Sequence, residues 1–167
     1  MNFDEQTILN NAVTAWKRHH DMTYSLLEQL TDEQLYAPLP RPMLNNFAKH
    51  YEEMADVQRA YARAFHSGKL DFSMLSKEKP YTGVSTKAEL KALMQDADKQ
   101  IFDGIAACPP DRAIDIFGNR CSRADLIQTL LHHELFHQGQ FYIFSNALKF
   151  DLPADWCDFW WIPKMYS

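Results

Sequence analysis

Two histidines four residues apart are the part of this sequence best suited to chemistry. They lie in the segment His133-Glu134-Leu135-Phe136-His137, which matches the pattern H-E-x-x-H. On a helix, positions i and i+4 lie above one another on the same face, so both imidazoles can bind one metal ion. Neutral imidazole is a good ligand for zinc, nickel, copper and iron. The alternative is a pair of core histidines satisfied by hydrogen bonds.

A third histidine, His50, favours the metal. It lies in the middle of an otherwise apolar stripe whose steps of three and four residues are typical of one helix face. The members of that stripe are Met43, Phe47, His50, Met54, Val57, Tyr61 and Phe65. Burying an unsatisfied polar group costs ~1–3 kcal/mol, and one shared ion removes this cost for three histidines at once. We therefore predict that His50, His133 and His137 bind one divalent metal ion, with three separately hydrogen-bonded histidines as the alternative.

Two further residues of the same helix are candidates for a substrate pocket. Glu134 is the acid/base candidate by its place in the motif, but it points about 100° away from His133 on a helix. We expect it to face solvent or to lie behind the metal ligands. Gln140 lies one turn beyond His137, where it either faces the site or has a structural role.

The other histidines have weaker cases. His19 lies on the inward stripe of the first predicted helix, which reads Ile8, Ala12, Ala15, His19, Met22, Leu26 and Leu30. It is a fourth ligand, a pocket wall or a core residue bonded to a neighbour, and we favour the last. His20 and His132 fall one residue off the stripes, so we expect both at the surface.

Four long helices are predicted to position these residues. The first runs over about residues 4–30, and the second starts near Met43 and ends before Gly68. A capping box of Thr86 and Glu89 opens the third after a loop over 68–85, and the fourth follows Ser122 and reaches about 149. A short extended segment is expected at 113–117. An aromatic tail at 153–167 should pack on the body.

This pattern predicts one all-α domain over residues 1–167, a four-helix bundle. The formal charge of −5, with no basic patch, disfavours a nucleic-acid partner. No apolar run approaches the ~18–20 residues that span a bilayer. The first residues lack the features of a signal peptide, so we expect a cytoplasmic protein.

A zincin-type metallopeptidase is one alternative for H-E-x-x-H, with Glu134 as general base. A metzincin would continue with glycine where Gln140 stands. A gluzincin needs a downstream glutamate ligand, and no glutamate follows Glu134. Strand signals for the sheet of a protease cleft are also missing. The sequence therefore disfavours a peptidase.

Four segments together resemble the DinB/YfiT-like superfamily. The segment 133–140, His-Glu-Leu-Phe-His-Gln-Gly-Gln, is similar to its last-helix signature, and 44–50, Leu-Asn-Asn-Phe-Ala-Lys-His, to its second-helix motif. The segment 117–122 fits the turn before the last helix of that family, and Leu152-Pro153 fits the segment after it. The resemblance covers nearly the whole chain.

The resemblance implies a four-helix bundle, often dimeric, with a divalent metal ion on His50, His133 and His137. Characterised relatives include bacillithiol S-transferases and mycothiol-dependent maleylpyruvate isomerase, and others are described as hydrolases. We therefore expect zinc or nickel, a small-molecule substrate, a homodimer, and activation of water or of a low-molecular-weight thiol such as bacillithiol. A bundle that binds metal or ligand without catalysis is the remaining alternative.

Overall fold

The computed structural model describes residues 4–73, 75 and 81–166. Within these ranges, four long helices form the body of the molecule: α1 (Glu5–Gln29), α3 (Phe47–Ser67), α4 (Lys87–Ala107) and α5 (Arg123–Leu148). Two short helices, α2 (Asp32–Tyr36) and α6 (Ala154–Trp160), follow α1 and α5. The predicted all-α four-helix bundle is confirmed.

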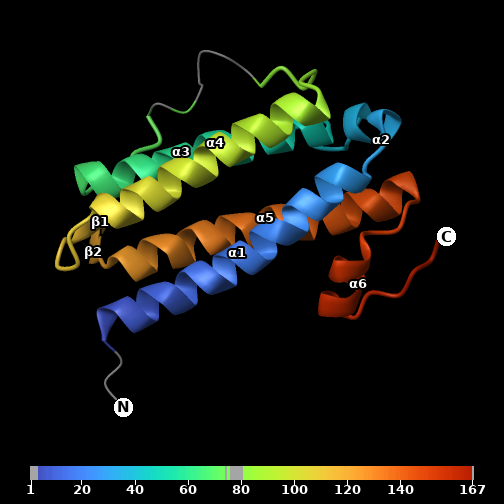
Figure 1. The fold of residues 1–167 in the computed structure, drawn as a ribbon. Coiled ribbons are helices and arrows are strands. Elements are labelled where there is room, and N and C mark those ends of the chain that lie inside the picture. The colour runs from blue at the N-terminus through green and yellow to red at the C-terminus, as the bar shows by residue number, and fades with distance from the viewer. Residues whose placement is uncertain (1–3, 74, 76–80, 167) are drawn as a thin grey trace.

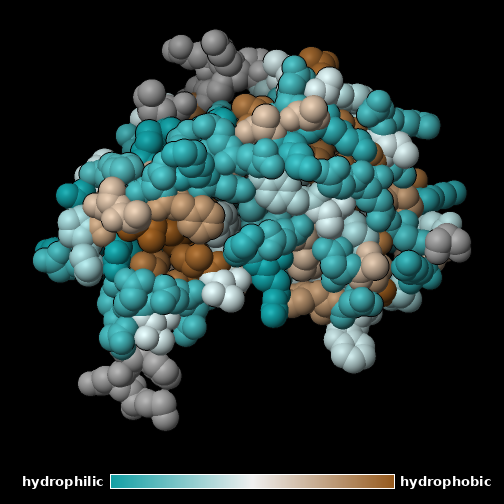
Figure 2. All heavy atoms as spheres, viewed as in Figure 1, coloured by the Kyte–Doolittle hydropathy of each residue, from teal (hydrophilic) through white to brown (hydrophobic). Residues whose placement is uncertain are grey.

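The four helices form two layers. As Figure 1 shows, α3 runs alongside α4, and α1 runs alongside α5. Contacts of α3 with α5 and of α1 with α4 join the layers, and the core fills the space between them. The face drawn in Figure 2 is mostly hydrophilic, with apolar side chains showing in a hollow between α4 and the N-terminal half of α1. The bundle thus places α5 against α1 on one side and α3 on another.

Local capping explains where most helices begin and end. Complete capping boxes open α2 at Thr31, α4 at Thr86 and α5 at Ser122, each satisfying backbone N–H groups that lack a partner within the helix. Gly68 ends α3 in the left-handed conformation, with φ of 75°, which glycine adopts without a steric penalty. The predicted starts of the third and fourth long helices are therefore confirmed.

A two-stranded hairpin leads into α5. Strand β1 (Ile114–Ile116) pairs antiparallel with β2 (Asn119–Cys121). The two turn residues, Phe117 and Gly118, have φ of 53° and 86°, as a type I′ turn requires. Both isoleucines of β1 are buried. The predicted extended segment at 113–117 is confirmed.

The start of α3 differs from the prediction. Asn46 caps α3 by accepting a hydrogen bond from the Lys49 N–H at 2.9 Å, so the helix begins at Phe47 and not near Met43. Met43 is 85% exposed in the preceding connector, which removes it from the buried stripe. The rest of that stripe, from Phe47 to Phe65, is buried.

The buried face of α1 also differs from the predicted one at the N-terminal end of the helix. Ile8 is 48% exposed and Ala15 is exposed, whereas the neighbouring Leu9 and Trp16 are buried. The face is rotated by about one residue because Trp16, the larger apolar side chain, packs into the core.

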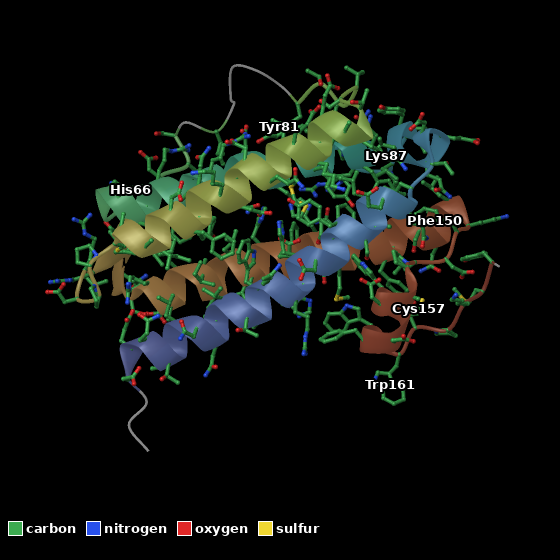
Figure 3. All side chains as sticks on the ribbon, in the orientation of Figure 1. His66, Tyr81, Lys87, Phe150, Cys157 and Trp161 are labelled. Atoms are coloured by element: carbon green, nitrogen blue, oxygen red, sulfur yellow. The ribbon has the colours of Figure 1, made fainter. Side chains whose placement is uncertain are left out.

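The C-terminal tail packs on the bundle through one of its aromatic residues above all. Trp156 is buried, and its indole N–H donates to the Met22 carbonyl at 2.6 Å. Trp161 is 91% exposed and projects away from the helices (Figure 3). Ser167, and residues 74 and 76–80 of the predicted loop at 68–85, lie outside the described residues. No helix that the structure describes is long and apolar enough to cross a membrane.

Two helix glycines offer a matched test of the packing. A Cβ at Gly139 of α5 would meet nothing within 4 Å, so no described neighbour packs closely against this glycine. A Cβ at Gly104 of α4 would lie 3.1 Å from the Ala62 carbonyl oxygen of α3. We expect Gly139→Ala to raise the free energy of unfolding by about 1 kcal/mol and Gly104→Ala to lower it. Urea unfolding measures both, and stabilisation by Gly104→Ala would contradict the close α3–α4 contact.

Candidate metal centre

The three histidines singled out by the sequence meet in one buried row. His133 and His137 lie one turn apart on α5, and His50 reaches them from α3. His137 is the middle member: its Nδ1 is 3.0 Å from Nδ1 of His50, and its Nε2 is 3.2 Å from Nε2 of His133. His50 and His137 are almost fully buried, whereas His133 is one-fifth exposed. The α3–α5 contact therefore brings together all three predicted ligands.

A carboxylate that the sequence analysis missed joins this row. Glu53 Oε2 lies 2.9 Å from Nε2 of His137 and 3.5 Å from Nε2 of His133. These three atoms form a compact group that could hold a metal ion. His50 is not part of that triangle; it touches the opposite nitrogen of His137. The spacing of Glu53, three residues after His50 on one helix, was the available signal, because i and i+3 share a face.

The donor spacing fits one ion. Zinc ligands lie ~2.0–2.1 Å from the metal, so two ligands of a tetrahedral site are about 3.4 Å apart. The triangle of Glu53, His133 and His137 has edges of 2.9, 3.2 and 3.5 Å. Imidazole and carboxylate are ligands that zinc accepts together. Side chains with this geometry need little movement to bind a divalent ion.

The protonation states also suit a metal ion. Burial lowers the pKa of His50 to about 3, helped by the nearby His137 and Arg41. Burial likewise lowers the pKa of His137. Burial alone would raise the pKa of Glu53, but its contacts with His133 and His137 lower it overall. Near neutral pH the centre therefore holds neutral buried imidazoles and one negative charge, and a bound imidazole must be neutral.

Hydrogen bonding within the row leaves buried atoms without a partner. If His137 donates its Nε2 proton to Glu53, its Nδ1 must accept a proton from Nδ1 of His50. The Nε2 atom of His50 then has no hydrogen-bond partner. The Leu44 carbonyl approaches this ring, but not in hydrogen-bond geometry. If His137 instead donates from Nδ1, its Nε2 lone pair faces the Glu53 carboxylate. A proton on Nε2 of His133, which is 3.2 Å from Nε2 of His137, or a bound cation relieves that repulsion, so the row is compatible with a bound ion.

Glu134 points elsewhere. Its carboxylate is 3% exposed and is bonded to two residues of α1: Oε2 lies 3.1 Å from Nδ1 of His20, and Oε1 accepts from the Thr23 hydroxyl. Of the two places expected for Glu134, exposure to solvent is therefore wrong, and the carboxylate lies against α1, away from the face that carries the two histidines of the motif. The prediction that His20 lies at the surface is wrong too, since its ring is 3% exposed, whereas His132 is exposed as expected. Glu134 needs His20 because a buried carboxylate requires a partner.

Two other predicted pocket residues have partners of their own. His19 is buried, with Nδ1 3.1 Å from Oε1 of Gln138, and its ring contacts Phe159 and Trp160 of α6. This is the favoured interpretation, a core histidine bonded to a neighbour. Gln140 is half-buried and accepts a hydrogen bond from Arg41.

His20 carries a buried positive charge. Its Nε2 lies 2.8 Å from Oδ1 of Asp98 on α4, opposite the contact with Glu134. Burial opposes the charge, but Glu134 and Asp98 outweigh it and raise the pKa of His20 to about 10. The pKa of each carboxylate is lowered in turn, against the effect of burial. This cluster joins α1, α4 and α5 electrostatically.

Comparison with protein families gives a match. A family model described as the DinB superfamily matches residues 15–141. The matched range covers most of the chain and includes the complete His50, Glu53, His133 and His137 cluster. A search of curated proteins found no match.

The charged His20 makes a testable contribution to stability. A group whose pKa is raised by folding stabilises the protein fully below its unfolded pKa, ~6.5 for histidine, and loses this effect as the pH passes its folded pKa. We expect His20→Ala to lower the free energy of unfolding by about 3–5 kcal/mol near pH 6, because it leaves Glu134 unpaired. The deficit should shrink as the pH rises through about 10. Urea unfolding across this range measures it, and a constant deficit would mean that His20 is neutral.

Proposed function

The chain belongs to the DinB superfamily, and from that premise we propose that it is a divalent-metal-dependent enzyme acting on a small electrophile. The nucleophile is a low-molecular-weight thiol, with water as the alternative, so the activity is that of a thiol S-transferase or a hydrolase. Zinc or nickel is the proposed metal, and bacillithiol is one thiol of the proposed class. The observation that carries the proposal is the donor cluster of Glu53, His133 and His137 with His50 against it.

We propose a role for each side chain of the cluster. His133 and His137 of α5 hold the ion from one helix and Glu53 from another, so the packing of α3 on α5 fixes the site. His50 either completes the ligand set or positions His137 through its Nδ1 contact. A divalent ion in such a site acts as a Lewis acid that lowers the pKa of a bound water or thiol.

His133 and Glu53 form the accessible side of the cluster. Each side chain is 20% exposed, whereas His50 and His137 are almost inaccessible. A small molecule therefore approaches along His133 and Glu53. Such an opening suits a small ligand better than a peptide, which needs an extended groove.

The position of Glu134 counts against a zincin-type peptidase. In that mechanism the glutamate of H-E-x-x-H acts as general base beside the metal. Here Glu134 is hydrogen-bonded to Thr23 and paired with the charged His20 of α1. A carboxylate with a lowered pKa and two partners is a weak base. Glu134 is better explained as a structural residue.

Metal analysis tests the ligand set. We expect the purified protein to bind about one divalent ion per chain. His133→Ala, His137→Ala and Glu53→Gln should each weaken metal binding by more than about 100-fold, beyond the ~10–100-fold loss typical of residues that only support a ligand. His132→Ala is the matched control, since His132 is the exposed neighbour of His133 and should leave metal binding unchanged.

His50→Ala then distinguishes two ligand sets. Loss of metal equal to that of His137→Ala supports His50 as a ligand, as the sequence predicts. A loss of only ~10–100-fold supports a positioning role and a centre built on Glu53, His133 and His137. Full metal retention in both His133→Ala and His137→Ala would refute the metal centre altogether.

A substrate panel tests the reaction. The metal-loaded protein is offered bacillithiol, glutathione or cysteine with a series of small electrophiles, and peptides and simple esters in parallel. We expect thiol conjugation in the wild type and its loss in His133→Ala, because that variant lacks a metal ligand. Product formation is followed by mass spectrometry.

The same panel identifies the alternatives. Ester hydrolysis that requires the metal but no thiol would replace the transferase with a hydrolase. Metal-dependent peptide cleavage that disappears in a folded Glu134→Gln variant would favour the zincin. Full metal occupancy without turnover of any class would favour a bundle that binds metal or ligand without catalysis.

A further inference from the structure

Arg41 places a positive charge beside the histidine row without a matching negative charge. It lies in the connector between α2 and α3 and is half-buried. Its Nη1 donates to Oε1 of Gln140, the residue three positions after His137 on α5. Its guanidinium also lies over the Phe136 ring, 5.8 Å from the centroid. The connector thus brings a cation onto the turn of α5 that carries His137.

Two ring contacts connect this cation to the proposed centre. The Phe136 ring contacts the His137 ring, with centroids 5.9 Å apart. The charge of Arg41 is also among the causes that lower the pKa of His50. Arg41 therefore lies toward the His50 side of His137, and Glu53 contacts the opposite side of the His137 ring, between His137 and His133.

No described carboxylate pairs with Arg41. Two of the other arginines that are not exposed have such partners: Arg59 pairs with Asp96 at 3.1 Å, and Arg123 pairs with Glu5, whereas Arg112 donates to the His66 carbonyl. The contacts of Arg41 in the described ranges are a neutral amide and an aromatic ring. A guanidinium has five N–H donors, and one bond to Gln140 leaves most of them available.

We propose that Arg41 binds the carboxylate of the small molecule that occupies the metal centre. The inference rests on the proposed function and deepens it, because it assigns the substrate class: a thiol or electrophile with a carboxylate group. The planar fork of arginine matches the two oxygens of a carboxylate. One guanidinium also balances the single charge of a carboxylate, whereas a phosphate carries about −1.5 to −2 at pH 7.

Gln140 has a defined part in this arrangement. Its bond to Nη1 holds one side of the guanidinium, whose central carbon lies over the Phe136 ring, 5.8 Å from the centroid. A cation held from two sides loses less conformational entropy when it binds an anion. Gln140 is therefore a positioning residue, which agrees with the structural role that is one of its two expected roles.

Thiol binding to the cobalt-loaded protein tests the proposal without turnover. Co(II) replaces zinc in similar sites, and thiolate binding to it gives an absorption band that can be titrated. The probes are 3-mercaptopropionate and the neutral 2-mercaptoethanol. The variants are Arg41→Met, Arg41→Lys and, as the matched control, Arg18→Met. Arg18 also lies over a phenylalanine, with 5.7 Å to the Phe159 centroid, but contacts α6 instead of the histidines.

We expect the wild type to bind 3-mercaptopropionate about 10-fold or more tightly than 2-mercaptoethanol, as a charge-assisted hydrogen bond would produce. Arg41→Met should abolish this preference without changing cobalt affinity, and Arg41→Lys should keep part of it. Arg18→Met should behave as the wild type. Unchanged preference in a folded Arg41→Met protein would overturn the role of Arg41 alone. Failure of the wild type to bind cobalt would overturn the proposed function and this inference together.

Discussion

Four polar side chains in two successive turns of α5 must be satisfied inside the bundle, and the surrounding structure follows from that constraint. His133 and His137 lie on one face, and Glu134 and Gln138 lie about 100° around the helix on the next. Each unpaired buried group would cost ~1–3 kcal/mol, more for a charged one. The bundle meets this requirement by packing α1 on one face and α3 on the other. Each of these helices must therefore supply polar partners directly opposite the polar side chains of α5.

The two sides meet the requirement differently. On the α1 side, the Glu134 charge is balanced by His20, and Gln138 donates to the His19 carbonyl at 2.7 Å. On the α3 side, Nε2 of His50 is buried without a partner, and the single carboxylate of Glu53 serves the row of three histidines, whereas the charged His20 of α1 lies between two carboxylates. In low-dielectric surroundings a buried polar atom without a partner destabilises the fold, so such atoms persist where a ligand supplies the missing contact. The α1 side therefore acts as structural support, and the α3 side has the character of a binding site.

Sequence alone predicted the features that depend on local chemistry. Capping boxes at Thr86 and Ser122, and the i and i+4 pair of His133 and His137, are encoded within a few residues. The features it missed depend on which helix lies opposite. Glu53 and His20 resemble ordinary surface residues until α5 is placed beside them, and the apolar period cannot show that a charged pair is buried. The rotation of α1 was missed for the same reason: Ile8 and Leu9 are equally apolar, and only packing selects between them.

The connector between α2 and α3 shows how a segment without regular structure can position a side chain. The prolines at 38, 40 and 42 fix φ and remove backbone hydrogen-bond donors. They thereby reduce the number of conformations open to the unfolded chain. The Leu39 N–H donates to the Asn45 carbonyl at 2.8 Å and closes the segment into a compact loop. Met43 adopts φ of 70°, an uncommon conformation for a residue other than glycine, and such strain persists only where neighbours enforce it. Because both ends of the loop are tied to helices, Arg41 is held against α5 by the same backbone that starts α3 at Phe47. The position of Asn46 as the cap of α3 thus decides where His50 and Glu53 lie and also where the guanidinium can reach.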